Sequence, residues 1–261
     1  MLQRLSPNDL ALLVPHLEPD VYFLEDGIAS IVAKIPKGRD TEVGLIGMEG
    51  MSGALVVLGG DRAVHDTYMQ LGGNGFRMPA PALTAALAAS NTLKALLLLY
   101  VQTLYIQTSY TALVNARSKL DERLARWLLM CQDRVRDDRF SITHEFMAVM
   151  LGVRRPGVTV AIQELEGRGL IRASRGEIVI RDRYGLFQIA DGTYSEPEKE
   201  YERLIGKPHG HISGRGCTGR KVFLAVWLRN ACNWPPAGAR ARETRWRCRT
   251  AAKAKRALAA S

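Results

Sequence analysis

Four polar side chains that can read DNA bases lie in one short stretch of the chain: Arg154, Arg155, Thr159 and Gln163. A guanidinium can bridge O6 and N7 of guanine, and a glutamine amide can bridge N6 and N7 of adenine. A threonine can contact a phosphate or the methyl group of thymine. These side chains read sequence when a helix carries them into the major groove, so the elements around them decide whether they can act.

Three helix breakers lie in the same region, at Gly152, Pro156 and Gly157. In a helix interior, proline costs ~3 kcal/mol and glycine ~1 kcal/mol relative to alanine. At the first turn of a helix, however, the missing N–H of proline is harmless, and a glycine supplies the positive φ of a tight turn. The breakers therefore predict two helices, over 144–151 and 155–166, joined by a turn at Gly152, which is the arrangement of a helix-turn-helix.

Capping and apolar spacing agree with this division. Thr143 is the expected N-cap of the first helix. Ala148 is small enough to let the second helix cross the first closely. The expected inward stripe of the second helix consists of Val158, Ile162 and Leu165.

A hairpin is expected directly after the second helix, which Gly169 ends. The runs 170–173 and 177–181 predict its strands, and Arg175 at its tip is well placed to contact the phosphate backbone. Together these elements predict a winged helix-turn-helix that binds double-stranded DNA. The alternative is an interaction module that binds no nucleic acid, since 141–183 holds only 7 basic against 5 acidic side chains.

The N-terminal part of the chain has a different texture. Short β-rich runs occupy 21–24, 28–33, 41–46 and 66–71, and glycines or turn residues separate them. Such spacing predicts a compact antiparallel barrel or roll. An alanine-rich run over 80–89 predicts a helix after the last strand.

The longest predicted helix runs from Thr92 to about Ala116, and a shorter amphipathic helix is predicted over 119–136. The long helix carries two apolar seams. Two seams predict two partners, the roll and the same helix of a second subunit, and we assign the first seam to the dimer interface. The alternative is a core helix that its own domain encloses. The first seam consists of Leu93, Leu97, Tyr100, Leu104, Gln107 and Thr111, and the second of Leu96, Leu99, Thr103, Ile106, Tyr110 and Leu113.

The charge of the chain is unevenly distributed. The formal net charge is +10, from 36 basic and 26 acidic side chains, but 207–261 contains 13 of the basic ones and one of the acidic ones. The other 206 residues therefore hold 23 basic and 25 acidic side chains. The excess belongs to the tail, so the DNA-binding hypothesis depends on the helix geometry and not on the total charge.

Other classes of protein are not favoured. The uncharged run 95–116 is long enough to cross a bilayer, but its polar residues are spread around the helix, so we expect no membrane span and a cytoplasmic protein. The four cysteines form no C-x-x-C pair, which argues against structural zinc. We find no nucleophile–base set, paired carboxylates or phosphate-binding loop, and expect no enzyme.

The order of the predicted parts resembles the Crp-Fnr superfamily of bacterial transcription regulators. The resemblance covers roughly 1–206, and its most specific pieces are VYFLEDGIASIVA at 21–33, GLIGMEGMSG at 44–53 and HEFMAVMLGVRRPGVTVAIQELEGRGLI at 144–171. It implies an α+β fold with an N-terminal, cyclic-nucleotide-binding-like β-roll, a long dimerisation helix and a C-terminal winged helix-turn-helix. It also implies a homodimer on a palindromic operator, with RNA polymerase as a further partner.

By the same resemblance, the base-contacting positions are Arg154, Arg155, Pro156 and Thr159. The family often has an acidic residue after the arginine, where this chain has Pro156. Its usual half-site preference is therefore not carried over.

The effector side departs from the family pattern. Cyclic-AMP binders of the family use a glutamate for the ribose and an Arg-Ser or Arg-Ala pair for the phosphate. Here Glu49 is present, but Arg62 falls early in its loop, and His65 and Asp66 occupy the phosphate-facing place. No cysteine precedes Cys131 to hold an iron–sulfur cluster. The sequence supports neither ligand, and these four residues define a pocket for an unknown small-molecule effector.

Two further departures concern the ends of the resemblance. About twenty residues that the family has before Val21 are missing, which predicts an incomplete roll. The segment 207–261 is either a basic arm that contacts phosphates or an out-of-frame translation. These observations leave open a ligand-sensing module without DNA binding or a degenerate, non-functional member. The expected domains are the sensor roll at 1–91, the dimerisation helix at 92–118, the winged helix-turn-helix at 119–190, and a disordered acidic linker and basic tail at 191–261.

Overall fold

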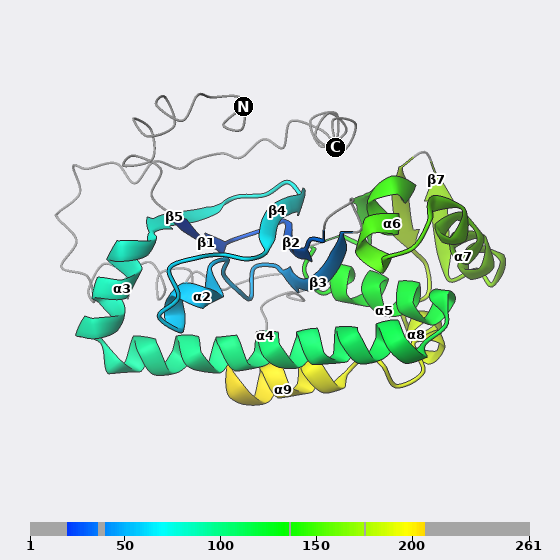
Figure 1. The fold of residues 1–261 in the computed structure, drawn as a ribbon. Helices are drawn as coiled ribbons and strands as arrows, with labels where there is room; N and C mark the ends of the chain where they lie inside the picture. The colour runs from blue at the N-terminus through cyan, green and yellow to red at the C-terminus, as the bar shows by residue number, and fades with distance from the viewer. Residues whose placement is uncertain (1–19, 36–39, 136, 175, 207–261) are drawn as a thin grey trace, which may run out of the picture.

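The computed structural model describes residues 20–35, 40–135, 137–174 and 176–206. The basic tail and Arg175 lie outside these residues. A long helix runs along the base of the molecule, the β-roll lies above one half of it, and the winged helix-turn-helix lies at its other end (Figure 1). The predicted order of roll, long helix and winged helix-turn-helix is confirmed.

The roll consists, in the described residues, of two small antiparallel sheets. Strand β1 (Asp20–Leu24) pairs with β5 (Gly75–Pro79), and β2 (Ile28–Ala33) lies between β3 (Thr41–Ile46) and β4 (Asp66–Leu71). The four strands expected from the sequence are confirmed. The fifth, β5, was missed because its residues are all half-buried or exposed, without the alternation that marks a strand with one buried face.

Two helices accompany the roll. The short helix α2 (Ala54–Val57) lies between β3 and β4 in sequence, and α3 (Ala80–Ala89) matches the alanine-rich run. The chain then bends by 120° into the long helix α4 (Asn91–Arg117). Ser90 caps α4, since its side chain accepts a hydrogen bond from the backbone N–H of Leu93 at 3.2 Å.

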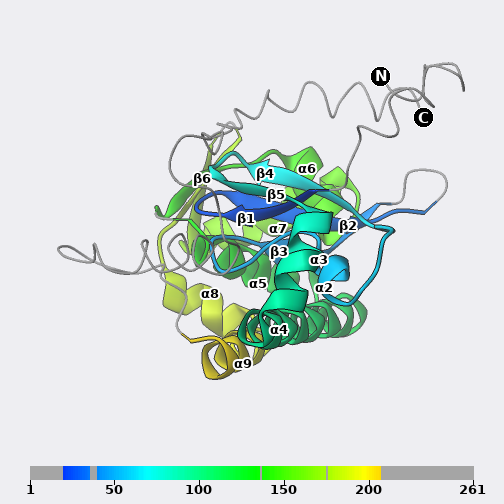
Figure 2. The ribbon, with the colours of Figure 1, turned by 90° about the vertical axis from the view of Figure 1, so that its left-hand side faces the viewer.

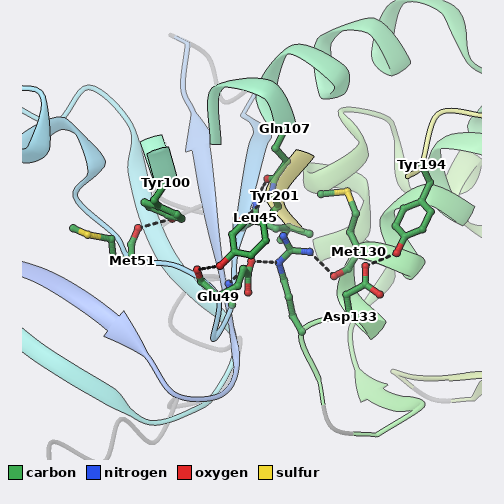
Figure 3. Close-up of polar contacts among 11 residues, drawn as sticks. Leu45, Glu49, Met51, Tyr100, Gln107, Met130, Asp133, Tyr194 and Tyr201 are labelled. Atoms are coloured by element: carbon green, nitrogen blue, oxygen red, sulfur yellow. Dashed lines mark hydrogen bonds and ion pairs between the residues drawn. The ribbon is translucent and has the colours of Figure 1, made fainter. Parts of the chain in front are cut away.

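One seam of α4 faces the roll of its own chain, which corrects the assignment of that seam to a dimer interface. Leu93, Leu97 and Tyr100 are buried in a cluster with residues of the roll and of α3. Tyr100 also donates a hydrogen bond from its hydroxyl to the carbonyl of Met51 at 2.9 Å (Figure 3). The periodicity identified the seam correctly, but spacing alone does not say which of two partners a seam contacts.

Further along the same seam, Gln107 acts as a hydrogen-bonding partner for β3. Its Oε1 accepts from the backbone N–H of Leu45 at 2.6 Å, and its Nε2 donates to the carbonyl of Leu45 at 3.3 Å (Figure 3). Thr111 donates to the carbonyl of Gln107 at 2.9 Å, and Leu104 is half-buried within the chain. The polar residues of this seam therefore hold α4 against the roll.

The C-terminal domain has the predicted winged helix-turn-helix order. Helix α5 (Leu120–Gln132) leads to β6 (Arg139–Ser141), α6 (His144–Leu151) and α7 (Arg155–Gly167). The wing follows as β7 (Ile171–Ser174) and β8 (Glu177–Ile180), and β8 lies between β6 and β7 in one sheet. Helix α5 ends at Gln132, before the predicted end at 136.

The segment 191–206 is structured, so the expectation of a disordered acidic linker there is wrong. Two helices extend the domain after the wing, α8 (Arg183–Ile189) and α9 (Glu196–Leu204), and α9 lies alongside α4 (Figure 1). Tyr201 and Ile205 pack against the cluster that α4 forms with the roll. The acidic composition of 191–206 predicted disorder, although Tyr201 and Ile205 are apolar residues that pack on the roll and α4.

A second hydrophobic cluster joins the roll to the C-terminal domain. Ile28, Val32 and Leu45 from the three-stranded sheet share one core with α5, α6, α7 and the wing. The edge-to-face contact of Tyr68 on β4 with Phe146 on α6, with ring centroids 5.8 Å apart, lies at this junction. The end-on view of Figure 2 shows how the elements of the roll and of the C-terminal domain lie above α4 and α9. The C-terminal domain therefore covers the sheet of the small roll.

Within the described part of the chain, no single helix is long and apolar enough to cross a membrane. Only the sharply bent pair of α3 and α4 meets the criteria of length and composition together.

Candidate nucleic-acid interface

Helix α7 buries one face and exposes the other. Val158, Ile162 and Leu165 are at most 3% exposed and pack in the core, which confirms the predicted inward stripe. On the opposite side, the side chains expected to read bases face solvent. Arg154, Arg155, Pro156 and Gln163 are exposed, and Thr159 is half-buried.

The turn before α7 has the predicted geometry. Thr143 caps α6 by accepting a hydrogen bond from the backbone N–H of Phe146 at 3.2 Å. Gly152 ends α6 with a φ of 60°, in the left-handed region that favours glycine. Pro156 lies in the first turn of α7, where no intrahelical partner for its nitrogen is needed.

Gly152 and Gly157 lie where the helix-turn-helix packs closely against neighbouring elements. A Cβ at Gly152 would lie 3.1 Å from Oγ1 of Thr41, so the turn packs directly against the roll. A Cβ at Gly157 would lie 3.2 Å from Cδ2 of Leu120. Gly157 therefore allows the start of α7 to approach α5, a reason that the local sequence did not reveal.

Two side chains at the start of α6 contact the proposed reading face. Glu145 forms an ion pair with Arg155 at 3.0 Å, between side chains that are 54% and 63% exposed. His144 forms a hydrogen bond through Nδ1 with Oγ1 of Thr159 at 3.1 Å, and Thr159 also donates to the carbonyl of Arg155 at 3.3 Å. Glu145 and His144 were not predicted as site residues, although both lie in the first turn after the Thr143 cap.

The free basic charge near α7 is modest. Arg154 and Arg172 are exposed and form no ion pair with the described residues. Other arginines of the domain are paired, as Arg168 is with Glu164 at 2.7 Å and Arg139 with Glu177 at 3.4 Å. The surface therefore has only a few unpaired basic side chains, and they lie around one helix. This arrangement favours contacts with individual bases and phosphates over nonspecific electrostatic binding to a polyanion.

The predicted effector residues have different surroundings in the structure. Glu49 is 10% exposed and forms an ion pair with Arg134 at 2.7 Å, beyond the end of α5 (Figure 3). Burial acts to lower the pKa of Arg134, but the charges of Glu49 and Asp133 raise it above its ordinary value. Glu49 also accepts a hydrogen bond at its backbone carbonyl from the hydroxyl of Tyr201 at 2.7 Å. Glu49 therefore joins the roll to the C-terminal domain.

The other three residues of that prediction lie on an exposed loop and strand start. Arg62 and His65 are exposed, and Asp66 forms an ion pair with Lys34. No hydrogen bond or ion pair between described residues joins them to Glu49. The shared effector pocket that the family resemblance implies therefore stays a prediction.

Comparisons with known proteins agree with this architecture. Residues 122–189 match the Crp-like helix-turn-helix domain. No curated protein matches the sequence.

Among solved structures, the chain is similar to a transcriptional regulator of the CRP family from Thermus thermophilus. The two share 19% identity and a TM-score of 0.51 over 66% of this chain and 87% of that one. It is also similar to a Crp/Fnr-family transcriptional regulator from Eubacterium rectale, with 16% identity and a TM-score of 0.52 over 72% of this chain and 96% of that one.

The exposed face of α7, the capped turn before it and the wing after it all lie within the matched domain. The roll and the long helix that carry this domain complete the fold shared with those regulators. The match therefore identifies residues 122–189 as a Crp-like, DNA-binding helix-turn-helix domain, and the chain as a whole has the fold of those regulators.

Proposed function

We propose that the protein is a homodimer that binds a palindromic operator by inserting α7 of each subunit into the major groove. The observation that supports this most directly is the asymmetry of α7. Its apolar stripe is buried, while Arg154 and Arg155 at its N-terminal end and Gln163 further along are exposed. In helix-turn-helix proteins, the N-terminal residues of the second helix contact the base edges.

Arg155 is the principal base-reading side chain in this proposal. In the free protein its guanidinium is paired with Glu145, and both side chains are more than half exposed. Exposed pairs of this kind contribute roughly 0–1 kcal/mol, whereas a bidentate contact with guanine is worth roughly 1–3 kcal/mol. The ion pair with Glu145 is therefore weak enough for Arg155 to exchange it for a contact with a base.

The second seam of α4 is the proposed dimer interface. Leu96 is 40% exposed and Leu113 is 52% exposed, Leu99, Ile106 and Tyr110 between them are half-buried, and Thr103 at the middle is buried. These residues lie on a stripe that repeats with steps of three and four, as in a helix pair. Exposed apolar positions that persist along a helix are typical of an interaction surface.

We also propose that DNA binding responds to a small-molecule effector and acts through RNA polymerase in the cytoplasm. The resemblance to Crp-Fnr regulators supports these points. The contacts between the roll and the C-terminal domain support them too. Because the roll shares one core with α6 and α7, a conformational change in the roll would alter the packing of these two helices.

The test compares, in the full chain, Arg155 at the start of α7 with Arg168 just after its end. Operators are selected from randomised duplexes and binding is measured by fluorescence anisotropy. Arg155→Ala should weaken binding to the selected operator by roughly 1–3 kcal/mol and relax the preference at one base position. Arg168→Ala is the matched control, because Arg168 is also exposed but lies at the other end of the helix, paired with Glu164. Equal losses in both variants, or none in either, would remove the role assigned to Arg155.

A further inference from the structure

A small cavity lies where the roll meets the C-terminal domain. It is lined by β3, the C-terminal half of α4, α5 and the end of α6. Its volume is about 20 Å³, which is enough for one particle of about the size of a water molecule and too little for a nucleotide. Three ionisable side chains line it: Glu42 from β3, and Arg123 and Arg126 from α5.

Arg126 is a buried cation without a matching carboxylate. The residue is only 4% exposed, and it forms no ion pair with a described residue. Its Nε donates to the carbonyl of Thr193 at 2.9 Å, and one terminal nitrogen lies 3.4 Å from Oγ1 of Thr111. The other terminal nitrogen has no protein partner among the described residues. A buried charge that lacks a counter-charge is costly, so this site favours an anion.

Arg123 adds a second cation to the same cavity. One terminal nitrogen donates to the carbonyl of Leu151, at the end of α6. Its Nε is buried without a partner in the described part of the chain, and it too forms no ion pair there. Burial lowers the pKa values of both Arg123 and Arg126, as expected for cations that are not fully compensated. Glu198 and Glu42 oppose this shift for Arg126 from beyond ion-pair distance.

Glu42 is the third ionisable group of the cavity, and it is 5% exposed. Its Oε1 accepts a hydrogen bond from the indole Nε1 of Trp127 at 2.9 Å, while its Oε2 has no partner among the described residues. Burial raises the pKa of Glu42 to about 7, against the lowering effects of its polar and charged neighbours. The titratable, polar or charged groups that face it are Ser30 on β2, Tyr68 on β4, Arg126, Trp127 and Cys131 on α5, and Arg134 just after α5.

The protonation of Glu42 decides what this cavity accepts. A protonated carboxyl has an O–H to donate, and the two guanidinium groups also donate, so the free hydrogen-bonding capacity of the site is that of a donor set. An ionised carboxylate would instead repel a negative ion.

We propose that this cavity binds one small monovalent anion of about the size of chloride, held by Arg123, Arg126 and the protonated carboxyl of Glu42. The anion contacts β3 of the roll and α5 together, and Arg123 extends the contact to the end of α6. Anion and proton then bind together, and both strengthen the junction between the roll and the helix-turn-helix. This site is independent of whether the protein binds an operator.

The experiment uses the full chain with Trp227, Trp234 and Trp246 replaced by phenylalanine, so that Trp127 is the only tryptophan left to report. Sodium chloride is titrated against sodium gluconate at constant ionic strength, because gluconate is too large for the cavity. We expect a saturable change in Trp127 emission and a matching rise in Tm. The apparent affinity should fall roughly thirtyfold between about pH 6 and about pH 8.5, as the protonated fraction falls. Formate should bind more weakly than chloride, and acetate should have no effect.

Two variants make the result specific. Glu42→Gln keeps a neutral donor in place of the protonated carboxyl, so it should retain chloride binding and lose its pH dependence. Arg126→Met should abolish the saturable response, while Arg168→Met, which removes a surface arginine outside the cavity, should not change it. If Arg126→Met fails to fold, the pH dependence of chloride binding in Glu42→Gln tests the proposal instead. A chloride response that is linear, or one that keeps its pH dependence in Glu42→Gln, would overturn the proposal.

Discussion

Glu42 is a buried carboxyl, and its contribution to the free energy of unfolding depends on pH. Because burial raises its folded pKa to about 7 from 4.5, the folded state binds more protons than the unfolded state between these values. The free energy of unfolding should therefore fall as pH rises through this window. Glu42→Gln should remove this component and stabilise the protein near pH 8 by roughly 1–3 kcal/mol. The measurement is urea unfolding of both proteins across pH in gluconate buffer, and parallel pH profiles would contradict the assignment.

Gly152, in the turn of the helix-turn-helix, and Gly167, at the end of α7, form a matched pair. Gly152→Ala places a Cβ at positive φ and 3.1 Å from Oγ1 of Thr41, so it should destabilise the protein by roughly 1–2 kcal/mol. Gly167 has no atom within 4 Å of its Cβ position, so Gly167→Ala should be neutral or stabilise by up to about 1 kcal/mol. Chemical unfolding of both variants checks the sign at each site. Destabilisation by both would show that the turn has no special requirement.

Predictability at the residue scale follows the range of the interaction. Thr143, Gly152 and Pro156 were placed correctly because caps and turns depend on a few neighbouring residues. The contacts of Glu49 were not predicted, because its partners, Arg134 and Tyr201, are distant in sequence. A motif can show that a carboxylate is present, but not which cation the fold brings to it.

Helix α9 is an element that the sequence analysis missed, and it ties the end of the described chain to the roll. Tyr201→Phe removes the hydroxyl that donates to the carbonyl of Glu49 and should cost about 1 kcal/mol. Tyr184→Phe is the control, because Tyr184 is 72% exposed, and its change should stay within about 0.5 kcal/mol. Urea unfolding compares the two. A Tyr201 variant as stable as the control would mean that α9 does not hold the roll.

The free seam of α4 should set the oligomeric state. Leu113→Glu introduces a charge on a half-exposed position of that seam and should raise the dimer dissociation constant at least tenfold, equivalent to about 1.4 kcal/mol. Leu58→Glu, on an exposed leucine outside α4, should leave the constant unchanged. Sedimentation velocity over a range of concentrations measures both. If Leu113→Glu dimerises as tightly as the parent protein, the interface lies elsewhere.

At the element scale, most boundaries were predictable and most partners were not. The strands with alternating burial and the helices with clear caps were found, while β5 and α9 lacked such a signal. Periodicity also found both seams of α4. It could not show which partner each seam contacts, and Gln107 of the first seam in fact bonds to Leu45 of its own roll.

The roll and the helix-turn-helix share one core, so the molecule should unfold as one unit. Leu45 is 1% exposed and lies in the cluster that joins β3 to the C-terminal domain. Leu45→Ala should cost roughly 2–5 kcal/mol and lower the protection of amides in both domains together. Hydrogen exchange monitored by mass spectrometry checks this. Loss of protection in the roll alone would show that the two domains are separate folding units.

At the scale of the whole molecule, the order of the parts was readable from the sequence, and their mutual packing was not. An apolar stripe on α6 or β2 predicts that one face of the element is buried, but it does not identify the element that packs against that face. The sequence predicted an incomplete roll, and nothing in it indicated that the C-terminal domain covers the sheet. This packing is what would let a change at the roll reach the reading helix.

The central claim is that two copies of α7 read two half-sites at once. The most direct test is to titrate the full chain against the selected operator, and against the same duplex with one half-site scrambled, over a range of salt concentrations. We predict two subunits per operator and a loss of at least a hundredfold in affinity when one half-site is scrambled, about 2.7 kcal/mol. We also predict that this ratio persists as salt weakens both complexes. Equal affinity for the two duplexes at every salt concentration would contradict the account.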